Sequence, residues 1–107
     1  MAKFGLLILS LLVIYSARAH HSRAVFDLSS TIEVEGTIRE VAWRNPHAFV
    51  VVDSINADGN YTKWTFEGHS IAGLTRNGWA RETFALGERV VVAARPNRDS
   101  ETRFGLL

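Results

Sequence analysis

Apolar and polar residues alternate along several short segments of the chain, and this pattern is the first indication of its fold. Residues 31–43 read TIEVEGTIREVAW, and Ile32, Val34 and Ile38 fall on one face of the segment. Glutamate, threonine and arginine side chains occupy the other face. A period of two residues predicts a β-strand with one buried face.

The apolar phase of this first segment changes before the segment ends. After Ile38 the apolar residues are Val41 and Trp43, so the alternation slips by one position. Such a slip predicts a β-bulge near Glu40, and Gly36 predicts a bend in the same strand.

Four later segments also have the composition of strands. Residues 56–60 (NADGN) form a hairpin signal between two of them, with Asp-Gly at the tip. β-Branched and aromatic residues dominate the segments themselves. The predicted strands are residues 47–53 (HAFVVVD), 61–67 (YTKWTFE), 89–95 (RVVVAAR) and 102–107 (TRFGLL).

One short helix interrupts the strands, over residues 70–77 (SIAGLTRN). Ser70 is a good N-cap, and Asn77-Gly78 is a stop signal. Three strands, a helix and two strands follow the order of a five-stranded OB-like barrel, which makes the chain all-β with one short helix. A generic small barrel and an open sheet packed on one helix are the alternatives. The fifth strand runs to the last residue, so we expect a shorter C-terminus than in related chains.

The N-terminus has the pattern of a secretory signal peptide. Lys3 precedes an uncharged run over residues 4–15, which is too short for a membrane span of roughly 20 residues. Ala17-Arg18-Ala19 is an A-x-A cleavage signal. We therefore expect a signal peptide over residues 1–19, an extended arm over 20–30, an OB-like domain over 31–107, and a periplasmic location without a stable membrane span.

Charge and composition exclude several function classes. The chain carries 12 basic and 11 acidic residues, and two of the basic ones, Lys3 and Arg18, leave with the signal peptide. No basic excess remains to indicate a nucleic-acid partner. The chain has no cysteine, no glycine-rich phosphate loop and no recognisable catalytic motif. We expect a binding module and not an enzyme.

The histidines offer the most specific candidate chemistry. Cleavage after Ala19 makes His20 the first residue, so its α-amine and its imidazole can chelate one metal ion. Nitrogen ligands of this kind suit Cu(II). His47, beside the Asn-Pro turn, is the best third ligand, and His21 offers a rival mode that uses the amine, a backbone amide and its ring. In the simpler alternative, the two N-terminal histidines are an unordered arm and His47 donates to a backbone carbonyl.

Tryptophan is frequent, with three residues in the chain. Core and rim packing is the simplest explanation, because a buried indole covers a large apolar area. Alternatively, Trp43 and Trp64 line a groove for a ligand or a protein, with Asn45 in the adjacent turn, since OB barrels bind ligands across neighbouring strands.

Several short stretches resemble one family of small exported bacterial proteins, the domain-of-unknown-function family 6152. They are AHHS at the mature start, VAWRNPHAFVVVD across the first turn, EGHS before the helix and NGWARETFALGERVVV after it. The resemblance implies an exported, barrel-like domain, and it implies no activity. The chain departs from the family pattern at His69, which argues against a functional role for that residue.

Three hypotheses for function follow. The first is binding of a divalent metal, Cu(II), through His20 and His47, with His21 as the alternate ligand. The second is a barrel that recognises an envelope component through Trp43, Asn45 and Trp64. The third is a structural envelope protein without a discrete site.

Overall fold

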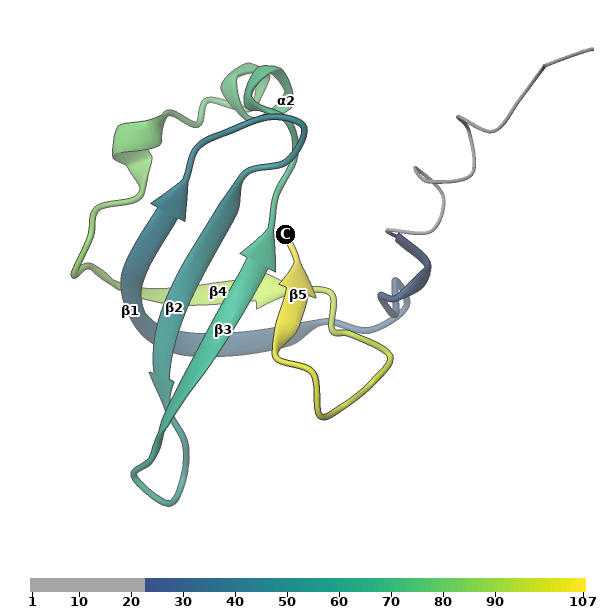
Figure 1. Ribbon diagram of the computed structural model, residues 1–107, viewed down its shortest axis with the longest axis vertical. Coiled ribbons are helices and arrows are strands. Elements are labelled where there is room, and N and C mark those ends of the chain that lie inside the picture. The colour runs from purple at the N-terminus through teal and green to yellow at the C-terminus, as the bar shows by residue number, and fades with distance from the viewer. Residues whose placement is uncertain (1–22) are drawn as a thin grey trace, which may run out of the picture.

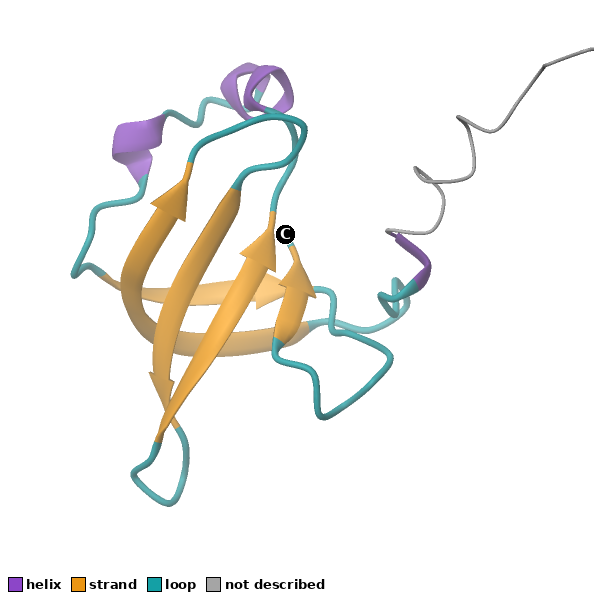
Figure 2. Ribbon diagram, in the orientation of Figure 1, coloured by secondary structure: helices purple, strands orange, loops and turns teal. Residues whose placement is uncertain are grey.

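The computed structural model describes residues 23–107, which form one curled β-sheet with a short helical segment at one end (Figures 1 and 2). The predictions for the signal peptide, its cleavage site, His20 and His21 lie outside the described residues. Within residues 23–107, no helix has the length and apolar character needed to cross a membrane. The elements are β1 (Ile32–Ala42), β2 (Phe49–Ile55), β3 (Tyr61–Glu67), α2 (Ile71–Arg76), the 3₁₀ helix η1 (Arg81–Thr83), β4 (Arg89–Ala94) and β5 (Phe104–Leu106).

The strands are arranged in the order β4-β1-β2-β3-β5. All neighbours are antiparallel except β3 and β5, which are parallel. A single antiparallel bridge between Arg95 and Leu106 joins the two ends of the sheet. Figure 1 shows β1 curving round so that β4 crosses behind β2 and β3. The result is a half-barrel with the strand order of an OB-like fold, as the sequence predicts.

The curl of the sheet comes from β1, which belongs to two ladders. Its residues from Ile32 to Thr37 pair with β4, and those from Thr37 to Ala42 pair with β2. The register with β2 shifts between Ile38 and Glu40, so Arg39 is the extra residue of a bulge. This confirms the bulge that the phase change predicts, and it increases the local bend of the strand.

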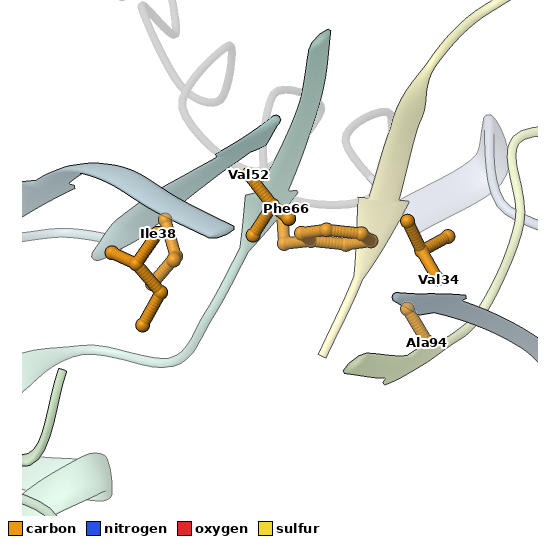
Figure 3. Close-up of a cluster of buried hydrophobic side chains, with 6 residues drawn as sticks. Val34, Ile38, Val52, Phe66 and Ala94 are labelled. Atoms are coloured by element: carbon orange, nitrogen blue, oxygen red, sulfur yellow. The ribbon is translucent and has the colours of Figure 1, made fainter. Parts of the chain in front are cut away.

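The core lies inside the curl. Figure 3 shows the Phe66 ring between Val34 and Ala94 on one side and Ile38 and Val52 on the other. Phe66 and Val52 are fully buried. Alternate residues of each strand therefore fill the interior, as the period of two requires.

The segment before β1 is attached to the far end of the sheet. Phe26 is buried and stacks on Phe104, with 5.5 Å between the ring centroids. The backbone N–H of Asp27 donates to the Pro96 carbonyl at 2.9 Å, and Phe26 forms a bridge with Asn97. The hydroxyl groups of Ser29 and Ser30 donate to the Asp27 carboxylate and lower its pKa to about 2.

Helix α2 is fixed by residues at both of its ends. The Ser70 hydroxyl accepts from the Gly73 N–H, so Ser70 is the N-cap that the sequence predicts. Asn45, in the loop between β1 and β2, accepts from the Ile71 N–H through its side-chain oxygen at 3.0 Å. The residues after the helix turn back, and the Trp79 N–H donates to the Leu74 carbonyl. The 3₁₀ helix η1 that follows has no periodic pattern and was not predicted.

Replacing Gly36 with alanine is expected to destabilise the domain by about 1–3 kcal/mol, the usual cost of overpacking. A Cβ atom at this position would meet the Asp53 carbonyl oxygen and would lie 2.6 Å from Cγ1 of Val52. Urea denaturation measures the loss. The matched control is Thr37→Ala, at the next, exposed position of the same strand. Equal stabilities of the two variants would contradict the close packing of Gly36 against Asp53 and Val52.

Asn45→Ala is expected to lower the free energy of unfolding by about 1 kcal/mol, because the Ile71 N–H loses its side-chain acceptor. Asn45→Asp keeps an acceptor oxygen and should retain the stability of the parent protein. Thermal or chemical denaturation of both variants checks the pair. A similar loss in both would mean that the hydrogen bond from Ile71 is not what Asn45 contributes.

Candidate functional site

His47 lies in the loop between β1 and β2, next to a cis Asn45–Pro46 peptide bond. Its ring Nδ1 is 3.1 Å from the Gly68 carbonyl oxygen and 3.4 Å from Oε1 of Glu67. Both of these partners are acceptors, so Nδ1 is the ring nitrogen that donates, and Nε2 takes no part in these contacts. The His47 side chain is 44% exposed, so a ligand can reach the ring.

Glu67 is the one charged residue that is buried among residues 23–107. Its carboxylate lies at the end of β3, directly beside the His47 ring. A buried carboxylate needs polar partners, and the imidazole N–H is one. In the simpler alternative drawn from the sequence, His47 donates to a backbone carbonyl in its own turn. The acceptor is instead Gly68, 21 positions further along the chain.

The described residues do not assemble a complete metal site by themselves. Within residues 23–107, no group of three or more histidine and carboxylate side chains comes together. His47 therefore contributes one exposed imidazole. Its predicted partners, His20 and His21, belong to the part of the chain that is not described, and their convergence on His47 stays a prediction.

Trp43 and Trp64 belong to two different aromatic clusters. Trp64 faces Val52 in the ladder of β2 and β3, while Trp43 follows Ala42, whose partner is Phe49. Trp43 is thus level with Ala48, four residues from Val52, so the two tryptophans are about 13 Å apart along the strand direction, at about 3.3 Å per residue. Trp64 stacks on Phe66 inside the sheet, with the Arg103 guanidinium 5.3 Å from its ring centroid.

Trp43 instead joins an aromatic cluster near α2. Its ring centroid lies 6.5 Å from that of Phe84, and Phe84 in turn stacks on Trp79 at 5.2 Å. Both partners come from the connection between α2 and β4. The side-chain oxygen of Asn45 accepts from the Ile71 N–H at the start of α2. Asn45 therefore positions this connection, and its oxygen already has a hydrogen-bond partner.

An apolar hollow lies beside this cluster, with Trp79 and Phe84 in its wall, and we call it the seam pocket. It has a volume of about 480 Å³, which is within the usual range for small-ligand sites. Its walls are the inner face of β1, β2 and β4, the α2–η1 connection and the end of β5. The lining residues are Ile38, Val50, His69, Leu74, Asn77, Trp79, Thr83, Phe84, Glu88, Val90, Val91, Val92, Ala93 and Leu107.

Two large apolar side chains at the seam pocket are partly left in solvent. Trp79 is 42% exposed and Leu107 is 38% exposed. Polar groups are few and stand among these apolar walls: His69, Asn77, Thr83 and Glu88. An apolar hollow with a small number of polar groups is the usual form of a ligand site.

Sequence reasoning did not identify the seam pocket. Trp79 and Phe84 lie outside the periodic segments, and their pairing across the connection leaves no regular spacing in the sequence. The available signal was the presence of two large aromatic residues in a polar connection, since loops seldom carry them without a packing or binding role.

The comparisons with known proteins identify a family and nothing more specific. The model of the family described as "Family of unknown function (DUF6152)" matches residues 8–106, nearly the whole chain. Neither the curated proteins nor the solved structures contain a match. The match confirms the family that the sequence resembles, and the chain belongs to the DUF6152 family.

Proposed function

We propose that this protein is an exported, periplasmic binding domain that holds an apolar group in the seam pocket. The observation that carries the proposal is the pocket itself, with Trp79 and Leu107 exposed around it. Burying large apolar side chains of this kind is worth about 1.5–3 kcal/mol each, so a ligand that covers them gains affinity. The signal-peptide pattern of residues 1–19 supports the location.

The position of the pocket also supports binding over simple packing. The interior of the sheet already has a buried core in Phe66, Val52 and their neighbours. The seam pocket lies beside that core, between the sheet and the segment from β3 to β4. The only helices of that segment are the short α2 and η1. The stacked rings of Trp79 and Phe84 give it one firm wall.

Titration with an apolar fluorescent dye of the anilinonaphthalene type tests this proposal. We expect one site, and we expect Trp79→Ala to weaken binding roughly tenfold, because the ring that forms the wall is removed. The matched control is Leu86→Ala, an exposed apolar residue of the same connection that does not line the pocket. Equal dye affinities for the two variants would rule out the seam pocket as the binding site.

A second candidate function is Cu(II) binding through the amine and ring of His20 together with His47. The geometry of His47 favours it: Nδ1 is engaged with Gly68, which fixes the ring and leaves Nε2 for a metal. Carbonyl partners of this type commonly orient histidines that bind metals. His21 remains the alternate ligand.

The copper proposal is tested on protein purified from the periplasm, after its N-terminal residue has been determined. We expect a chain that begins at His20 and one Cu(II) site, detected by electron paramagnetic resonance. His47→Asn keeps a side-chain N–H near Gly68 but removes Nε2, so it should weaken binding at least tenfold, on the order of one ligand's contribution. His69→Asn is the control. Copper binding that is indifferent to His47, or a mature chain that begins elsewhere, would rule out this site.

A further inference from the structure

Among the residues that the structure describes, the outer edge of β4 has no neighbouring strand over most of its length. In the sheet order β4 is the terminal strand, and its other side pairs with β1. Beyond β4, Arg95 exchanges two hydrogen bonds with Leu106, at 2.7 and 2.9 Å. β5 is only three residues long, so among the described residues this pairing extends no further along β4.

The Arg95 bridge defines which groups of β4 face the open edge. Main-chain N–H and C=O groups of alternate residues leave a strand on the same side. Ala93 and Val91 therefore point their N–H and C=O groups the same way as Arg95, away from β1. Val92 and Val90 point theirs toward β1 and turn their side chains to the interior, where they are half-buried.

The seam pocket lies directly inside this open edge, because Val90, Val91, Val92 and Ala93 all line it. A strand that continues the antiparallel pairing of Leu106 with Arg95 would next pair with Ala93 and then with Val91. Its intervening residues, opposite Val92 and Val90, would turn inward into the pocket.

We infer that the occupant of the seam pocket is an extended polypeptide segment that adds to the sheet as a strand antiparallel to β4. This inference rests on the proposed binding function of the pocket and names its ligand class. The segment carries apolar side chains at alternate positions, which enter the pocket, while its backbone pairs with Ala93 and Val91. This is peptide recognition by strand addition, in which backbone hydrogen bonds and alternate side-chain pockets act together.

A second copy of this chain fits the edge less well in the register centred on Val92. Two β4 strands paired antiparallel about Val92 would place Arg89 of each copy opposite Arg95 of the other. Like charges directly opposite one another destabilise a strand pair. A small apolar molecule would fill the pocket but would leave the main-chain groups of Val91 and Ala93 without partners.

The test uses a panel of synthetic octapeptides that alternate threonine with valine, leucine or phenylalanine, followed by fluorescence anisotropy. We expect at least one of them to bind and to protect the backbone amides of Val91 and Ala93 from hydrogen exchange. An N-methylated version of that peptide, methylated on the amides that face β4, should bind roughly tenfold or more weakly, as the loss of one or two hydrogen bonds implies.

Val91→Pro is the matching change in the protein. Proline removes an N–H that points to the open edge, and it leaves the hydrogen bonds between β4 and β1 in place. We expect it to weaken peptide binding roughly tenfold, because one edge donor is lost and the pairing strand is blocked. Val91→Thr, which keeps the N–H, is the control, and circular dichroism checks the fold of both.

The outcomes separate the two proposals. Dye binding that depends on Trp79, with no peptide bound or with N-methylated peptide bound equally well, would overturn strand addition and leave the apolar site standing. Peptide binding without protection of Val91 and Ala93 would overturn it as well. Loss of the Trp79 dependence of dye binding would overturn the proposed function itself. Self-association of the protein through β4, seen by sedimentation, would replace the peptide with a second copy.

Discussion

The close approach of β1 to β2 at Gly36 is the constraint on which the rest of the structure depends. The Gly36 position lies against the Asp53 carbonyl and the Val52 side chain, where no Cβ atom fits. At this point β1 changes its partner: its residues up to Thr37 pair with β4, and its residues from Thr37 onward pair with β2. The bulge at Arg39, three residues later, increases the bend. Together they convert a flat meander into a half-barrel.

Among residues 23–107, the two ends of the sheet meet at one point only. β5 is held by parallel pairing with β3 and reaches Arg95 through one bridge only. A closed barrel has no free edge, whereas an exposed edge strand is a template for pairing with another segment. Here the edge has Arg89 at one end and Arg95 at the other, and charged residues at an edge oppose pairing between identical copies. The central residues of the edge, Val90 to Ala93, are apolar.

Much of the fold could be predicted from the sequence because its signals are local. Alternation defines β1, Asp58-Gly59 marks the hairpin between β2 and β3, and Ser70 marks the start of α2. The site could be predicted far less well, because it depends on contacts between distant segments. The Gly68 carbonyl contacts His47 from 21 positions further along the chain, and Phe84 stacks on Trp79. Neither contact produces a regular residue spacing from which the sequence could predict it. Whether Trp43 and Trp64 share one site depends on the register of the strands, which the sequence does not define. The register places Trp64 opposite Val52, and Trp43 contacts Phe84.

Both proposed sites are built on one short segment, residues 67–69. Glu67 and the Gly68 carbonyl orient His47, and the His69 carbonyl accepts from the Ala48 N–H at 3.1 Å. On the opposite side, the Glu67 carbonyl accepts from the Leu107 N–H at 2.8 Å, and both His69 and Leu107 line the seam pocket. Backbone hydrogen bonds therefore connect the loop that carries His47 to the wall of the pocket through three consecutive residues. A rigid connection of this kind holds binding groups in place before the ligand arrives, which lowers the entropic cost of binding. The buried carboxylate of Glu67 is consistent with this role, because an ionisable group is retained in an apolar interior only where its partners are fixed.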